Sequence, residues 1–194
     1  MKAFLLSAAC FMLFACSGSD EDNVNNGNNP GNGEVSNTLH MSFKTPDWEQ
    51  FINCEQLDLY GFAVSESANA VSATSASTKE TFYFSIPVDS SAMVAPGNLK
   101  KYAITGYGDN VNPFEFSQKL PITQGSATYL ISSPGFGTDD YNEVVDIQYI
   151  GSEPNNAVFK VKCRYAMHAY ELGNSQNIKP ITGTFHFKVR TSKN

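Results

Sequence analysis

Three histidines are the first residues of this chain whose chemistry could serve a site, because imidazole nitrogens bind metals and exchange protons near neutral pH. His40 lies in the alternating segment 38–44, and His186 lies in the alternating segment 181–190. If these segments pair as antiparallel strands, the two rings could lie about 5 Å apart. A metal would need a third ligand, for which His168 is the candidate. The spacing is the only support for such a site, so the sequence predicts no metal site and three exposed histidines.

A second polar group, Asp139, Asp140 and Glu143, lies in the segment GFGTDDYNE. Calcium takes several oxygen ligands from acidic loops, but this spacing matches no EF-hand and favours a solvated acidic hairpin tip. The chain lacks the G-x-S-x-G, H-E-x-x-H, C-x-x-C and P-loop signatures, so the sequence predicts no catalytic residue and no cofactor. A carboxylate pair spaced for glycoside hydrolysis stays open, because a sequence does not give distances in space.

Aromatic residues in loops are the stronger indication of a site. Four of them lie in or beside segments rich in Gly, Asp, Asn and Pro: Trp48, Tyr107, Phe136 and Tyr141. Flat rings beside carboxylates and amides suit a carbohydrate, whose C–H face packs on a ring while its hydroxyl groups form hydrogen bonds. The alternative is that these rings close the ends of the core, and this alternative applies to Trp48 above all.

The cysteines divide between the N-terminal segment and the remainder of the chain. Cys10 and Cys16 lie near the N-terminus, and Cys54 and Cys163 lie in the remainder. An exported protein passes through an oxidising compartment, so a disulfide between Cys54 and Cys163 is allowed. Two buried thiols acting as small hydrophobic residues are the other interpretation, and both stay open at this point because the sequence gives no separation.

The N-terminus has the pattern of an exported protein. Residues 1–15 carry one positive side chain, Lys2, followed by an uncharged apolar run. This pattern predicts a signal peptide too short to span a bilayer. The run ends in Leu13-Phe14-Ala15-Cys16, which resembles the bacterial lipobox. The resemblance implies cleavage before Cys16 and lipidation of this cysteine, which would anchor the protein in a membrane.

The residues after this cysteine favour a position outside the cell. Asp20, Glu21 and Asp22 are similar to the acidic export signal of surface lipoproteins of Bacteroidota; the alternative is a solvated linker. The segment 23–37 is mostly Asn and Gly and cannot bury a core. We therefore expect residues 16–37 to be a lipidated flexible tether.

Composition limits the partners of the remaining residues, 38–194, whose length suits one domain. The chain carries 13 Lys and Arg against 19 Asp and Glu, a formal net charge of -6. The sequence contains no basic stripe, so we expect no nucleic-acid partner.

Strand-like alternation runs through this domain and must position the candidate residues. It predicts eight or nine strands, in the segments 38–44, 57–64, 81–88, 101–107, 113–122, 126–132, 142–150, 157–170 and 181–190. One-sided alternation favours antiparallel pairing, so the fold class is all-β, an antiparallel sandwich with a calycin-like barrel as the alternative. The segment 45–52 predicts a single helical turn with Asp47 as N-cap. The Ser- and Ala-rich segment 65–79 predicts a mobile loop.

Taken together, these features resemble the many uncharacterised surface lipoproteins of Bacteroidota. The matching pieces are Leu13 to Asp22 and the strand-like Gly183 to Phe187. The resemblance implies a lipid-anchored, surface-exposed position on the outer membrane and an all-β fold, and it carries over no activity and no site. The leading hypothesis is a non-enzymatic domain that binds an extracellular glycan or protein. A structural part of an envelope or adhesive assembly is the alternative, and a hydrolase ranks third.

Overall fold

The structure is a computed structural model and describes residues 34–54, 58–59, 61–75 and 78–193. Nine strands have four or more residues: β1 (His40–Lys44), β2 (Glu49–Asn53), β5 (Ala68–Thr74), β6 (Thr81–Pro87), β8 (Phe116–Pro121), β9 (Tyr129–Ser132), β10 (Tyr141–Ser152), β11 (Asn156–Glu171) and β12 (Asn174–Ser192). Three strands have two residues: β3 (Asp58–Leu59), β4 (Phe62–Ala63) and β7 (Lys101–Tyr102). The one helix among the described residues is α1 (Ser90–Met93). The predicted all-β class is confirmed.

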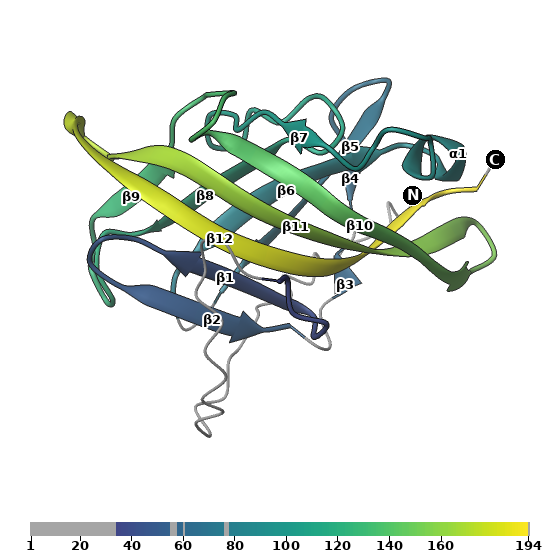
Figure 1. The fold of residues 1–194 in the computed structure, drawn as a ribbon, viewed down its shortest axis with the longest axis horizontal. Helices are drawn as coiled ribbons and strands as arrows, with labels where there is room; N and C mark the ends of the chain where they lie inside the picture. The colour runs from purple at the N-terminus through teal and green to yellow at the C-terminus, as the bar shows by residue number, and fades with distance from the viewer. Residues whose placement is uncertain (1–33, 55–57, 60, 76–77, 194) are drawn as a thin grey trace, which may run out of the picture.

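The strands form two layers that are joined through β11 (Figure 1). One layer runs from β2 through β1, β12 and β11 to β10, and the other runs from β9 through β8, β6 and β5 to β4. Residues 157–166 of β11 pair with β10, and its last three residues, Ala169–Glu171, pair with β9 instead. The end strands β2 and β4 each pair on one side within the described residues, so the sheet is open and the architecture is the predicted sandwich.

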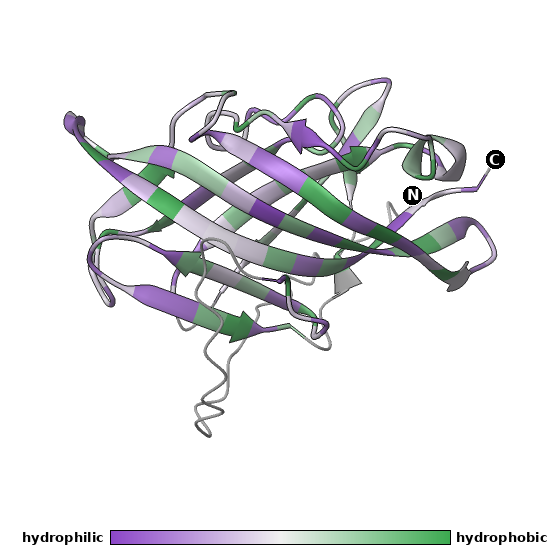
Figure 2. Cartoon of the chain, in the orientation of Figure 1, coloured by the Kyte–Doolittle hydropathy of each residue, from purple (hydrophilic) through white to green (hydrophobic). Residues whose placement is uncertain are grey.

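Phenylalanine side chains from both layers fill the space between the sheets. Figure 2 shows the alternation of polar and apolar residues along β11 and β12 that directs one face inward. Phe185 of β12 lies 5.0 Å from Phe84 and 5.1 Å from Phe116, measured between ring centroids, and Phe187 lies 4.6 Å from Phe82. These pairs connect β12 in one layer with β6 and β8 in the other. Each aromatic pair adds roughly 1 kcal/mol to the stabilisation from burial.

A tyrosine reaches across the sheet over a glycine. Tyr165 of β11 is the register partner of Gly183 in β12. The hydroxyl group of Tyr165 lies 3.0 Å from the carbonyl oxygen of Ser42 and 2.9 Å from Gln118 Oε1, both of which can accept its hydrogen bond. A Cβ atom on Gly183 would lie 2.1 Å from the Ser42 carbonyl oxygen and 2.5 Å from the Tyr165 hydroxyl oxygen. This position therefore requires glycine.

The same network contains a buried carboxyl group. Glu80 precedes β6 and is 1% exposed. Gln118 Nε2 donates a hydrogen bond to Glu80 Oε1, whereas Glu80 Oε2 has no hydrogen-bond partner among the described residues. Burial raises the pKa of Glu80 to about 8, because the charged form loses its hydration. The group is therefore mostly protonated at neutral pH.

The structure corrects two local predictions. The segment 65–79 contains the strand β5, which pairs with β6 over residues 68–74 and buries Ala68, Ala70 and Val71. Backbone pairing with a neighbouring strand outweighs the weak strand preference of Ser and Ala here. The segment 45–52 forms a turn and β2 rather than a helical turn.

Side-chain hydrogen bonds explain that turn. Thr45 Oγ1 accepts hydrogen bonds from the backbone N–H groups of Asp47 and Trp48, each at 3.1 Å. The side chain that bonds the backbone of this turn is therefore that of Thr45 rather than that of Asp47. Residues 34–39 enter β1 at its first residue, and this turn leaves β1 at the other end.

The pairing of Cys54 with Cys163 is wrong. Cys163 is a buried free thiol, so it does not bond Cys54. The strand register gives the reason, because Cys163, Phe185, Met41 and Ile52 form one row across β11, β12, β1 and β2. Cys54 lies two residues beyond Ile52, so about three strand spacings, or about 14 Å, separate the two cysteines. A disulfide requires Cα atoms within about 7 Å.

Candidate functional site

The inward face of the β11–β12 hairpin changes from apolar to polar near its tip. Lys179 is the register partner of Ala169, whose side chain is fully buried in the core, so Lys179 lies on the inward face. Glu171 and Asn177 continue the same face by their spacing along the strands. The opposite face carries Ile178, which is 58% exposed. The usual order of apolar inside and polar outside is reversed here.

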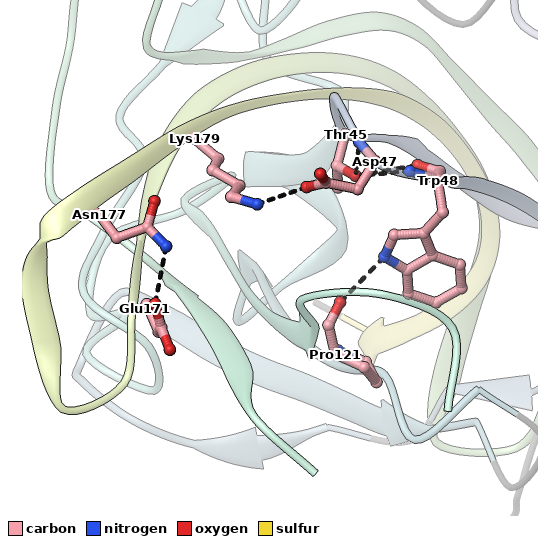
Figure 3. Close-up of polar contacts among 7 residues, drawn as sticks. All are labelled: Thr45, Asp47, Trp48, Pro121, Glu171, Asn177 and Lys179. Carbon is pink, nitrogen blue, oxygen red and sulfur yellow. Dashed lines mark hydrogen bonds and ion pairs between the residues drawn. The ribbon is translucent and has the colours of Figure 1, made fainter. Parts of the chain in front are cut away.

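Two polar pairs connect these residues to each other and to the turn after β1 (Figure 3). Lys179 Nζ lies 2.5 Å from Asp47 Oδ2, and the two side chains are only 18% and 34% exposed. Asn177 Nδ2 donates a hydrogen bond of 2.7 Å to Glu171 Oε2. The pairs bring residues from positions 47, 171, 177 and 179 to one end of the sandwich.

Trp48 lies beside the ion pair and is held on two sides. Its Nε1–H group donates a hydrogen bond of 3.0 Å to the carbonyl oxygen of Pro121, at the end of β8. Its ring meets that of Phe43 edge to face, with centroids 4.6 Å apart and an angle of 78° between the planes. The ring is partly buried against the core, in keeping with the expectation that Trp48 closes an end of the sandwich.

We call Asp47, Trp48, Glu171, Asn177 and Lys179 the Trp48 site. It combines an indole ring, two carboxylates, an amide and an ammonium group. Such a set can form hydrogen bonds to a polar ligand and pack against its apolar face.

The other predicted aromatic residues lie elsewhere. Tyr107 packs on the outer face of the second layer, where its ring centroid lies 5.3 Å from that of Tyr83. Phe136 is 68% exposed, and Tyr141 has Lys101 Nζ over its ring at 3.6 Å from the centroid. No ring contact joins any two of the four candidates within the described residues.

The histidines are placed differently from the prediction. His40 and His186 are cross-strand partners, as the pairing of the first and last strands predicts. Both are buried rather than exposed, and the carbonyl oxygen of Thr38 accepts from Nδ1 of His40 at 2.9 Å and of His186 at 3.2 Å. Burial lowers the pKa of His40 to about 4, so its ring is neutral at pH 7. Burial also lowers the pKa of His186, with a smaller contribution from Lys162.

His168 stands apart from the other two histidines. Its Nδ1 atom and its backbone N–H group both lie within hydrogen-bond distance of Asp140. It lies six residues along β11 from Lys162, the register partner of His186, which is about 20 Å of strand. Within the described residues, no group of three metal-ligating side chains gathers.

The acidic loop is engaged in local contacts. Asp140 bonds His168, and Glu143 forms a two-point ion pair with Arg164 at 2.8 and 3.1 Å. The Arg164 guanidinium lowers the pKa of Glu143 through these hydrogen bonds. The two carboxylates therefore orient neighbouring strand residues.

The three polar residues of the hairpin were not identified from the sequence. Their signal is the run ELGNSQNIK, in which Glu171 ends β11 and Asn177 and Lys179 lie on β12, all at inward positions of strands that are otherwise apolar inside. Gly173, with φ at 92°, marks the turn that makes this assignment possible.

The predicted lipidation residue Cys16 and the predicted export residues Asp20, Glu21 and Asp22 lie outside the described residues. In the described part of the chain, no helix has both the length and the apolar character needed to span a membrane. Comparison of the chain with protein-family models, with curated proteins and with solved structures found no significant match.

Proposed function

We propose that this protein is an outer-membrane lipoprotein on the cell surface whose non-enzymatic β-domain binds an extracellular glycan or protein. Lipidation at Cys16 would hold it in the membrane, and the acidic residues that follow would direct it to the outer leaflet. The domain would bind its ligand at the Trp48 site.

One observation carries the binding proposal: polar side chains replace apolar ones on the inward face of the hairpin, and one of them, Lys179, pairs with Asp47 beside Trp48 (Figure 3). Partial burial of Lys179 and Asp47 removes hydration from both charges, and it does not add the apolar contacts of a core residue. A sequence that needed only stability would continue the apolar pattern of Ala169 and Ile181. A ligand that uses these groups accounts for their placement.

The alternative of a structural component that adds a strand at the edge of β10 has less support. The second half of β10 has no strand partner opposite β11 within the described residues, but it carries two register shifts, at Val144/Asp146 and at Tyr149/Gly151. Bulges of this kind protect an edge against pairing with another chain. We therefore favour ligand binding at the end of the sandwich over the addition of a strand to this edge.

The ligand-binding role can be tested through fluorescence, because Trp48 is the single tryptophan of the chain. Its emission reports on the proposed site alone. We expect a saturable change in emission when the detergent-solubilised protein is titrated with purified extracellular glycans, glycopeptides or polypeptides that themselves lack tryptophan. Unchanged emission with all three kinds of titrant would overturn the binding role.

The anchor has its own test. We expect Cys16→Ala to abolish labelling with a radioactive or clickable fatty acid and to release the protein from the membrane fraction, because the variant lacks the sulfur that carries the lipid. Cys10→Ala is the matched control, since the proposed cleavage removes this residue. Mass spectrometry that finds Cys16 unacylated, whether free or in a disulfide, would contradict the anchor.

A further inference from the structure

The hydrogen-bonding capacity of the Trp48 site is only partly used. Asp47 receives Lys179 on Oδ2, and Glu171 receives Asn177 on Oε2. Within the described residues, Asp47 Oδ1, Glu171 Oε1 and Asn177 Oδ1 have no partner, and the Lys179 ammonium group has further N–H donors. The site therefore offers both acceptors and donors to a ligand.

This mixture suits hydroxyl groups. A hydroxyl group can donate to a carboxylate oxygen and accept from an ammonium or amide N–H group at the same time. Lys179 and Asn177 lie two residues apart on the same face of β12, a separation of about 7 Å. Neighbouring hydroxyl groups of a sugar ring could therefore meet both residues.

The charges select against anionic ligands. Asp47 and Glu171 supply two negative charges and Lys179 supplies one positive charge, which already lies 2.5 Å from Asp47. The site therefore carries one net negative charge, which would repel a uronic acid or a sulfate group but not an uncharged sugar.

The indole ring is fixed before a ligand arrives. The hydrogen bond to Pro121 and the contact with Phe43 hold Trp48 from two directions. A ligand would lose little binding free energy in ordering this side chain. A preorganised ring beside hydroxyl-binding groups is suited to the C–H face of a sugar.

We infer that the Trp48 site binds an uncharged carbohydrate, with Trp48 packed on the sugar and with Asn177, Lys179 and the two carboxylates bonded to its hydroxyl groups. The inference rests on the proposed ligand-binding function and names the class of ligand. It does not depend on the membrane anchor.

The test compares ligand classes on the detergent-solubilised full chain by Trp48 fluorescence. The probes are neutral gluco-, manno-, xylo- and galacto-oligosaccharides, hexuronate oligomers and sulfated galactans of similar length, and uncharged peptides. We expect a saturable change with at least one neutral oligosaccharide and at least tenfold weaker binding of its charged counterparts. Tighter binding of a charged sugar, or no response to any neutral sugar, would overturn the inference. A response to peptides alone would overturn it and leave the proposed function standing.

Variants connect the signal to the site. Asn177→Ala is expected to weaken neutral-sugar binding at least tenfold, and Gln176→Ala, an exposed neighbour on β12, is expected to leave it unchanged. Asp47→Asn removes one negative charge. We expect it to reduce the ratio between the affinity for the neutral oligosaccharide and the affinity for uronate oligomers. Circular dichroism confirms that each variant is folded. Equal affinities of Asn177→Ala and the unaltered protein, with no change of preference in Asp47→Asn, would show that sugar binds elsewhere and would refute the assignment.

Discussion

Replacing Glu80 by Gln is expected to raise the free energy of unfolding at pH 8 and to flatten its dependence on pH. The folded state holds the proton of Glu80 up to a pKa of about 8, and the unfolded state releases it near the ordinary carboxyl pKa of 4.5. Stability therefore falls as the pH rises between these values, because the unfolded state binds fewer protons. The shift corresponds to at most about 5 kcal/mol, lost progressively across this range.

The measurement is urea unfolding of both proteins at several pH values from 4 to 9. The difference between Glu80→Gln and the unaltered protein should grow with pH until about pH 8 and then remain constant. Glu66→Gln, at an exposed position before β5, is the control and should show no such growth. Parallel stability curves for Glu80→Gln and the unaltered protein would contradict a protonated, buried Glu80.

Replacing Gly183 by Ala is expected to destabilise the fold by more than about 3 kcal/mol. The new methyl carbon would lie 2.1 Å from the carbonyl oxygen of Ser42 and 2.6 Å from Tyr165 Cζ. The first of these atoms belongs to the backbone of β1, and the second belongs to a ring enclosed by Phe116 and Phe185. Neither can move without disturbing the sheet, so this overpacking lies at the upper end of the usual cost.

Thermal unfolding measures the effect. Gly137→Ala is the matched control, because no heavy atom lies within 4 Å of the Cβ position there. We expect the control to unfold within a few degrees of the unaltered protein and Gly183→Ala to unfold at least about 10 °C lower. An unchanged transition temperature for Gly183→Ala would show that Tyr165 does not cross the strand at this point.

Alternation predicted the long strands because it records which face is buried. Phe82, Phe84, Phe159 and Phe185 all occupy the inward positions that their spacing predicts. The same rule failed for β5, whose Ala and Ser residues give little contrast between the two faces. It also placed His40 and His186 outside without revealing that residues before β1 cover them.

The candidate site could be predicted only in part. Trp48 was identified from its loop, whereas Lys179 and Asn177 were not, since more than 120 residues separate them from Trp48 in the chain. Their meeting depends on the register of β1 with β12 and of β12 with β11, in which Lys44 pairs with Thr182 and Ala169 with Lys179. Register comes from the packing of the whole sheet rather than from any local segment. The polar residues on either side of Gly173 are visible in the sequence, but only the hairpin shows that they occupy inward positions of the strands.

The short strand β1 also separates two ends of the molecule. Residues 34–39 reach it at His40, and the turn that carries Asp47 and Trp48 leaves it after Lys44, about 17 Å away. If the chain before residue 34 is anchored in the outer membrane as we propose, β1 adds this length between the membrane anchor and the Trp48 site. The Trp48 site would then lie at the end of β1 that is farther from the tether, where a polysaccharide strand could reach it.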